Sequence, residues 1–325
     1  MRPSVQLARV IRSGLQESVH LGDVAVCDRL GRVVASAGEA TRPVFARSCM
    51  KPIQAAVSLQ AIAEDLPARQ LAVMCSSHNG EPEHVRVVLA LLRRAGLSAE
   101  ALRCPPSYPL DPASMARSGK PRPELSDCSG KHAGMLLACR RSGWDPASYP
   151  RRGHPLQRRI RRAVLRASGL ETVAVGVDGC GVPVHAMALS SLATVYARLA
   201  SPASLGDLEP QARACVEAML AEPYMVGGRD RVDTAIMVAT GDVVAKAGAE
   251  GLQCASLLGS GLGVALKVAD GGSRAGRAAL IRVLRQLDAL SPAAVRDLWP
   301  YARPPVLGGG RTVGGVVADV TLGPG

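Results

Sequence analysis

Aromatic residues are scarce in this sequence: phenylalanine, tryptophan and tyrosine together make up 2% of its 325 residues. Proteins that bind single-stranded nucleic acid stack the bases on aromatic side chains, so nucleic acid is not an expected partner. Long apolar runs are also missing, since none approaches the ~18 residues that a membrane-spanning helix needs. The first residues lack the charged-then-apolar pattern of an export signal. We expect a cytoplasmic protein with no membrane partner.

The nine cysteines form an odd number and follow no repeating spacing. In a cytosolic chain, such cysteines are buried thiols or metal ligands more often than disulfides. The formal charge is +12, and seven arginines gather between positions 151 and 166. A basic helix can bind the phosphates of a nucleic acid. The arginine excess is spread over the whole chain, however, which favours solvated basic surfaces.

Lysine is rare for so basic a chain: only five of the 39 basic residues are lysines. Arginine stays charged in proteins, whereas lysine can lose its proton. A lysine in an arginine-rich chain therefore indicates a position that needs a neutral amine or a compact donor. Lys51, Lys131 and Lys246 stand out because each lies in a short segment with serine, cysteine or glycine. Chance retention remains the alternative for the other two lysines.

Ser48 and Lys51 lie three positions apart, just before a segment that is predicted to be helical. Residues i and i+3 share one face of a helix. Their side chains could therefore meet, as in the S-x-x-K motif of acyl-transfer enzymes. Burial can lower the pKa of a lysine by several units, which would let it accept the proton of the serine. The alternative is an ordinary helix start capped by Ser48, which a lone S-x-x-K would favour.

Lys246 is a candidate for a second amine, because it ends a predicted strand and precedes Gly248. A second lysine nearby would favour the neutral form of the first. Glycine would let a substrate approach the backbone closely. The alternative is an exposed lysine at a strand end. Without the Ser48–Lys51 motif, that alternative would be preferred.

Cys128, Lys131 and Cys180 form a possible metal site, since each cysteine lies beside a polar turn. Thiolates suit Zn²⁺, and a catalytic zinc keeps one position open for a substrate or water. C-x-x-K is not a standard zinc spacing, so two buried thiols are the favoured interpretation from the residues alone. Asp178 could bind a ligand or a substrate amine, or simply cap a turn.

The pattern of apolar residues and turn signals predicts an α+β fold: one domain over residues 1–325, with an antiparallel sheet flanked by helices. Residues 104–126 are expected to be a long loop. Helices are expected at 48–63, 82–94, 155–168, 186–199, 208–220, 273–288 and 292–298, and strands at 22–36 (a hairpin), 71–75, 173–177, 243–247, 254–259, 264–269 and 312–321.

Six short motifs occur in order, and together they resemble the rhizobial-type, class 3 L-asparaginases of the asparaginase II family. The resemblance covers the chain from about residue 5 onward. The motifs are Arg47–Pro52, Cys75–Glu81, Asp127–His132, Val177–Gly181, Gly228–Thr234 and Lys246–Gly251.

The resemblance implies a serine β-lactamase-like fold, a homodimer and hydrolysis of L-asparagine to L-aspartate and ammonia. It implies that Ser48 is the nucleophile, with Lys51 as its base. Ser77, or alternatively Ser76, would pair with Lys246. The remaining residues would hold a zinc ion that helps to bind the substrate, or would contact the substrate itself. The implied zinc ligands are Cys128, Lys131 and Cys180, and the implied substrate-binding residues are Arg47, His78 and Asp178.

Two further activities remain open. One is another serine amidohydrolase of the same fold, such as a glutaminase or a β-lactamase-like esterase. The segments Ser126–Cys128 and Lys246–Gly248 match the S-D-N and K-T-G motifs of penicillin-binding enzymes only in part. That mismatch weakens a β-lactam activity. The other is a zinc-binding scaffold without catalysis, which would unfold when its metal is removed.

Overall fold

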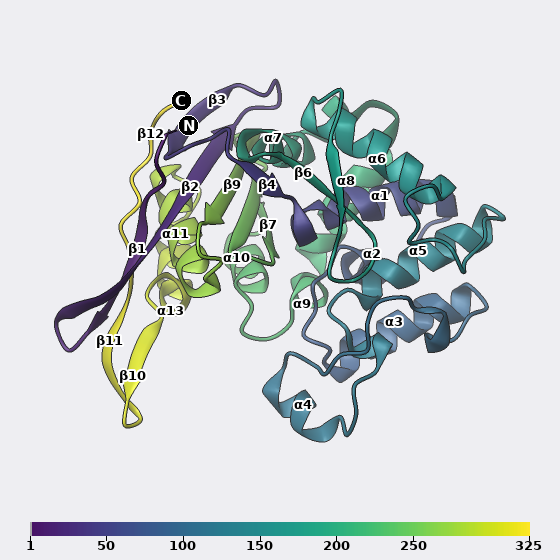
Figure 1. Cartoon of the computed structure of the whole chain (residues 1–325), viewed down its shortest axis with the longest axis horizontal. Coiled ribbons are helices and arrows are strands. Elements are labelled where there is room, and N and C mark those ends of the chain that lie inside the picture. Colours follow the sequence, from purple (N-terminus) through teal and green to yellow (C-terminus); the bar gives the residue numbers. More distant parts are fainter. Residues whose placement is uncertain (1) are drawn as a thin grey trace. The chain divides into compact units, whose positions relative to one another are not determined.

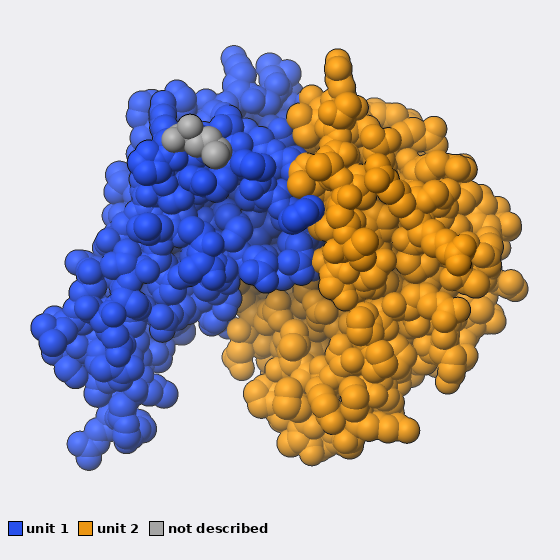
Figure 2. All heavy atoms as spheres, viewed as in Figure 1, with its two compact units in different colours: residues 1–49, 187–201, 235–325 blue, residues 50–186, 202–234 orange. Residues whose placement is uncertain are grey.

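A computed structural model describes residues 2–325 (Figure 1). The chain forms two compact units, which Figure 2 shows in different colours. Unit 1 contains residues 2–49, 187–201 and 235–325, and unit 2 contains residues 50–186 and 202–234. Each unit is therefore built from segments that are distant in the sequence. The expected single domain over residues 1–325 stays a prediction.

Unit 1 contains an antiparallel sheet with the strand order β10-β11-β1-β2-β9-β8-β7, extended by β3 beside β2 and β12 beside β3. Every strand pairs antiparallel with its neighbours, and β2 and β3 form the expected hairpin. The strands are β1 (Val5–Arg12), β2 (Leu15–Cys27), β3 (Val33–Ala37), β7 (Val243–Gly248), β8 (Leu252–Leu257), β9 (Leu262–Val268), β10 (Pro305–Gly308), β11 (Arg311–Ala318) and β12 (Gly323–Pro324). A short strand, β4 (Pro43–Phe45), precedes Ser48 in the chain.

Helices cover both faces of this sheet, as β9 shows. Gly263 lies so close to α7 (Leu189–Ala200) that an added Cβ would be 2.1 Å from Ala193 O. Val268 lies against Gly276 of α11 (Ser273–Gln286). Positions 263 and 268 differ by an odd number, so their side chains point to opposite faces of the sheet. The expected α+β fold, with helices flanking an antiparallel sheet, is confirmed. Two short helices, α12 (Pro292–Asp297) and α13 (Trp299–Ala302), follow α11.

Unit 2 is mainly helical, and α1 (Lys51–Ile62) lies at its centre. Eleven of the twelve α1 residues are buried. This helix packs against α5, α6 and α8. The helices are α2 (Ala68–Met74), α3 (Pro82–Arg94), α4 (Pro112–Arg117), α5 (Ser129–Arg141), α6 (Pro155–Ser168), α8 (Glu209–Ala221) and α9 (Pro223–Val226), with 3-10 turns η2 (Ala99–Ala101), η3 (Pro123–Leu125) and η4 (Pro202–Leu208).

Two elements continue from unit 2 into unit 1 along the chain: β6 (Pro183–Ala188) and α10 (Val232–Thr240). The first part of β6 pairs antiparallel with β5 (Ala174–Val177). The turn between these two strands carries Asp178 and Cys180.

The predicted strand at 71–75 is wrong, because these residues belong to α2 and the turn that follows it. A short apolar run fits a buried helix as well as a buried strand. All four residues from Leu71 to Met74 are buried. The expected long loop at 104–126 contains α4, whose start is capped by Asp111 Oδ2 accepting from Ser114 N at 2.7 Å. The strands β1 and β10 were not expected.

Among residues 2–325, no helix is both long enough and apolar enough to cross a membrane. The longest helices, α6 and α11, have 14 residues each.

Candidate active site

Ser48 lies in unit 1 on a tight 3-10 turn, η1 (Arg47–Met50), which leads directly into α1. Met50 is the cap residue of α1, and no side chain caps this helix. Ser48 is therefore not the helix cap that the alternative required. Arg47 has a φ of +43°, a region that residues other than glycine rarely adopt. Backbone strain of this kind gathers at functional sites.

Two contacts within unit 1 hold the turn that carries Ser48. Tyr196 of α7 donates its hydroxyl hydrogen to Cys49 O at 2.7 Å. Cys49 donates its thiol hydrogen to Lys246 O at 3.2 Å. Cys49 thus links the turn to β7, where Lys246 lies. Sequence analysis missed both contacts, because the partners are 147 and 197 positions apart and neither is in a local motif.

Lys246 is fully buried in β7, so the alternative of an exposed strand-end lysine is wrong. It lies opposite Cys254 of β8, and its Nζ donates to Ala247 O at 2.8 Å. A Cβ added at Gly248 would lie 3.1 Å from Cys49 Sγ. Packing against Cys49 is therefore one reason for a glycine at position 248.

Lys51 is the first residue of α1 and is completely buried in unit 2. Its Nζ donates to Ser77 Oγ at 2.9 Å and to Ser76 O at 2.5 Å. The Nζ is 3.5 Å from the backbone oxygen of Asp127 and 4.0 Å from its carboxylate Oδ2. Unit 2 thus brings a buried amine into direct contact with a serine hydroxyl. Sequence reasoning paired Lys51 with Ser48 and did not anticipate its contact with Ser77.

Ser77, not Ser76, is the serine whose hydroxyl meets this amine. Ser76 donates its own hydroxyl hydrogen to Val73 O at 2.7 Å. Both serines are buried, in the segment that follows α2. The geometry within unit 2 thus favours Ser77 over Ser76 as a functional hydroxyl.

His78 is completely buried, and both of its ring nitrogens have partners in unit 2. Nδ1 accepts from Gly80 N at 3.0 Å, and Nε2 lies 2.9 Å from Ser129 Oγ. Burial, followed by the charge of His84, holds the pKa of His78 well below its usual range. A neutral ring with its proton on Nε2 satisfies both hydrogen bonds. His78 therefore anchors the segment after Ser77 to the start of α5.

Two of the six motifs meet around Glu81 in unit 2. The carboxylate of Glu81 accepts from the Arg229 guanidinium at 2.7 Å and from Arg229 N at 2.9 Å. Asn79 Nδ2 donates to Arg229 O at 2.8 Å. Burial alone would raise the pKa of Glu81, but the hydrogen bonds from Arg229 N, Tyr224 and Asn79, with the Arg229 charge, outweigh it and lower the pKa. Gly228 has a φ of +112° and lies too close to Glu81 and Asn79 to carry a side chain.

Cys128, Lys131 and Cys180 also come together within unit 2. Lys131 Nζ donates to Cys180 Sγ at 3.1 Å, and the Cys128 thiol forms a hydrogen bond with Cys180. This hydrogen bond, opposed by burial and helped by the charge of Lys131, lowers the pKa of Cys180 to about 5. Asp178 Oδ2 lies 3.8 Å from Cys180 Sγ. The arrangement is a thiolate beside a thiol and an ammonium group.

The cysteines agree with the expectation from the sequence. All nine cysteines are free and buried. Among residues 2–325, no group of three or more His, Cys, Asp and Glu side chains is placed to hold a metal ion. A metal bound here would therefore need Lys131 as its third ligand from the protein.

The family model of L-asparaginase II matches residues 8–318, nearly the whole chain. The chain belongs to the L-asparaginase II family. Family membership supports an asparaginase that acts on a small molecule. No curated protein matches the sequence.

Several solved structures are similar to this L-asparaginase II family member. A β-lactamase from Mycobacterium bovis is 17% identical over 82% of this chain and 94% of its own, with a TM-score of 0.45. Mglu in its native form is 14% identical, with a TM-score of 0.41, and in its glutamate form it is 15% identical, with a TM-score of 0.40. This chain spans 61% of the length of Mglu.

The donor set of this L-asparaginase II family member fits a zinc ion. Cys180 contacts both the Lys131 amine and the Cys128 thiol, and all three residues are buried in unit 2. Thiolates are ligands that zinc prefers. Zinc requires deprotonated ligands, so binding would release the protons of Cys128 and Lys131. Cys180 is already poised as the thiolate. Burial lowers the pKa of His132, which follows Lys131 in the sequence, to about 3, and that of His185 to about 4.

Proposed function

We propose that this chain hydrolyses L-asparagine to L-aspartate and ammonia through a covalent intermediate on Ser48. Membership of the L-asparaginase II family supports the substrate class. The single observation that supports serine–lysine chemistry is the completely buried Lys51, whose amine lies 2.9 Å from the hydroxyl oxygen of Ser77. Burying an amine costs folding free energy, so a buried lysine indicates that the amine has a function.

In the proposed reaction, Lys51 accepts the proton of the Ser48 hydroxyl. The serine oxygen then forms a bond to the side-chain amide carbon of asparagine, and the carbonyl oxygen becomes an oxyanion. Backbone N–H groups of the η1 turn stabilise this oxyanion. When the C–N bond breaks, the leaving nitrogen takes this proton from Lys51 and departs as ammonia, which leaves the amine neutral.

The second half of the proposed reaction releases aspartate. Water loses a proton to the same amine and forms a bond to the ester carbon, and the Ser48 oxygen leaves and regains its proton. Ser77 and Lys246 assist the movement of protons. The hydrogen bond from Lys51 to Ser77 supports a relay that reaches beyond the nucleophile.

Substrate recognition is assigned to charged and polar groups. Arg47 supplies positive charge for the α-carboxylate of the substrate, and Asp178 supplies negative charge for its amino group. His78 acts indirectly, through the segment that carries Ser77. A zinc ion held by Cys128, Lys131 and Cys180 would act as a Lewis acid that helps to orient the substrate. The expected homodimer rests on the resemblance to the family, and sedimentation of the purified chain tests it.

The first experiment measures ammonia release from L-asparagine by the parent chain and by Ser48→Ala. Ser58→Ala is the matched control, because Ser58 is a buried serine of α1 that bonds only within its own helix, to Gln54 O at 2.9 Å. We expect activity in the parent and in the control, and a loss of about 10⁴-fold or more in Ser48→Ala. Each protein is assayed with zinc and with a chelator.

Two results would contradict the proposal. Ammonia release that survives in a folded Ser48→Ala variant would exclude this nucleophile. Absence of turnover on asparagine, combined with turnover of L-glutamine, an ester or a chromogenic β-lactam, would assign another serine hydrolase activity to the same site.

A further inference from the structure

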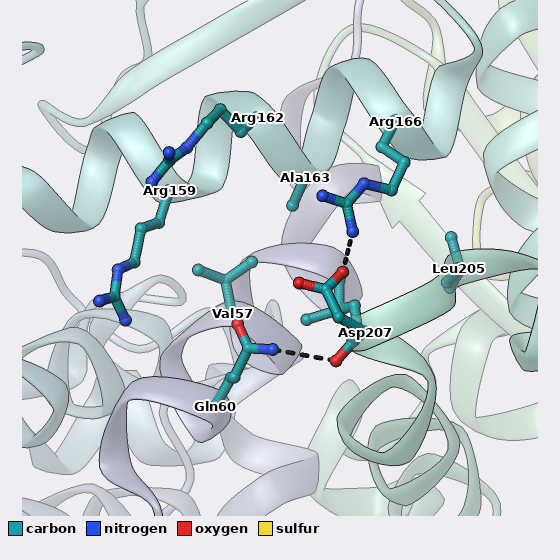
Figure 3. Close-up of a pocket in the computed structure, with 9 residues that line it drawn as sticks. Val57, Gln60, Arg159, Arg162, Ala163, Arg166, Leu205 and Asp207 are labelled. Carbon is teal, nitrogen blue, oxygen red and sulfur yellow. Dashed lines mark hydrogen bonds and ion pairs between the residues drawn. The ribbon is translucent and has the colours of Figure 1, made fainter.

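Unit 2 has a pocket of about 380 Å³ (Figure 3), and its lining includes none of the residues assigned to the reaction. It is formed by α1, α6 and η4. The floor is apolar, because Val57, Leu205 and Leu208 are all buried there. The volume lies in the range that is typical of small-molecule sites.

Three arginines of α6 line this pocket: Arg159, Arg162 and Arg166. They are spaced i, i+3 and i+7, which places them along one face of the helix. Asp207 is the only acidic residue of the lining, and it forms an ion pair with Arg166. Figure 3 shows this ion pair at one end of the pocket and Arg159 at the other end. Among residues 2–325, Arg162 forms no ion pair, so the pocket keeps an excess of positive charge.

Further contacts hold the pocket in shape without a ligand. Gln60 Nε2 donates to Asp207 O at 3.0 Å, which fixes the η4 segment against α1. The Arg159 guanidinium lies 4.7 Å from the centre of the Trp144 ring, a cation–π contact. The η4 segment and the Arg159 guanidinium are therefore already in position before a ligand binds.

We propose that this pocket binds a small organic phosphate. Arg159 and Arg162 would bind the phosphate oxygens, because a guanidinium group matches the geometry of phosphate and stays charged. The apolar floor would contact the carbon part of the ligand. The Arg166–Asp207 ion pair would close the other end. The proposal is independent of the activity assigned to Ser48.

A small ligand explains the pocket better than a nucleic acid does. Nucleic acids bind along extended basic surfaces, where each arginine contributes a similar share. In unit 2, the positive groups instead border a compact hollow with an apolar floor. Arg158 gives a direct comparison, because it is an exposed arginine of the same helix that does not line the pocket.

The test uses tryptophan fluorescence of the full chain. Trp144 and Trp299 are the two tryptophans, so Trp299→Phe leaves Trp144, beside Arg159, as the only reporter. Glycerol 3-phosphate, inorganic phosphate and glycerol are each titrated at constant ionic strength set with chloride. We expect a saturable change with glycerol 3-phosphate at millimolar concentrations, a weaker response to inorganic phosphate and none with glycerol.

The variants decide the assignment. Arg162→Gln should weaken the binding of glycerol 3-phosphate about tenfold or more, since a charge-assisted hydrogen bond is lost. Arg158→Gln removes the same charge from the same helix and should leave binding unchanged. The proposal is overturned if no phosphate gives a saturable signal. It is also overturned if both variants weaken binding equally, or if only duplex DNA binds, with a steep dependence on salt.

Discussion

Two pairs of buried cysteines in this protein look alike but differ in how a lysine is placed beside them. In unit 2, Cys128 and Cys180 form a hydrogen bond, and Lys131 Nζ lies 3.1 Å from Cys180 Sγ. In unit 1, Cys254 forms a hydrogen bond with Cys49, and Lys246 lies directly opposite Cys254. The Lys246 amine turns to Ala247 O, at 2.8 Å.

Cys180 and Cys254 differ in the direction in which their pKa values are shifted. The pKa of Cys180 falls to about 5, through the Cys128 hydrogen bond first and the Lys131 charge after burial. Burial, with the Cys49 hydrogen bond, instead raises the pKa of Cys254 well above its usual range. Cys180 therefore offers a thiolate to a metal, whereas Cys254 packs as a neutral thiol. The Lys131 amine, in contact with Cys180, adds to the effect of the Cys128 hydrogen bond and marks this pair as the candidate ligand set.

The largest expected effect is on zinc binding. Cys180→Ser removes the thiolate and should weaken zinc affinity roughly 100-fold or more, in line with the sensitivity of zinc sites to their ligands. Cys254→Ser should leave zinc affinity unchanged. Competition with a chromophoric chelator at one pH measures both. Equal affinities in the two variants would remove the distinction between the pairs.

The next effect separates the charge of Lys131 from its ability to bind a metal. Lys131→Arg keeps a cation beside Cys180, but arginine cannot lose its proton and offers no lone pair. Zinc affinity should fall about tenfold to 100-fold. Lys267→Arg is the matched control, because that lysine is not part of the candidate site. Full zinc affinity in Lys131→Arg would show that the amine serves only as a charge.

The sequence made part of this site predictable. The Ser48–Lys51 motif is visible in the spacing, and the rarity of lysine in an arginine-rich chain singles out Lys131 and Lys246, which are both buried. The β2–β3 hairpin was also predictable, because its turn signals lie within a few residues of the strands. The segment at 71–75 was misassigned, because five apolar residues carry no period that separates helix from strand.

Other parts depend on contacts between distant residues. Tyr196 bonds to a backbone oxygen, which leaves no pattern in the sequence, and its partner is 147 positions away. The contact of Lys51 with Ser77 and the division into two units also depend on contacts between residues that are distant in the sequence. Local spacing predicted which residue types carry the chemistry, but the partners of those residues depend on the tertiary fold.

A smaller effect is expected on stability in unit 1. Cys254→Ala removes the sulfur atom from a fully buried position, and the loss of packing should lower the free energy of unfolding by about 1–3 kcal/mol. Urea denaturation measures it. Zinc should not change this difference, because the Cys49–Cys254 pair is not a metal site. A loss that zinc reverses would contradict the assignment of this pair to the core.

The last variant, Tyr196→Phe, tests whether the hydrogen bond from Tyr196 to Cys49 O positions the turn that carries Ser48. Tyr196→Phe removes one hydroxyl and leaves the buried carbonyl of Cys49 without its 2.7 Å donor, which should cost about 1–3 kcal/mol of stability. If this hydrogen bond positions the turn, kcat on asparagine should fall while KM changes little. Tyr149→Phe, which removes another fully buried tyrosine hydroxyl, is the control, and it should lower stability without this kinetic signature. An unchanged kcat in a folded Tyr196→Phe variant would limit the Tyr196–Cys49 contact to stability and packing.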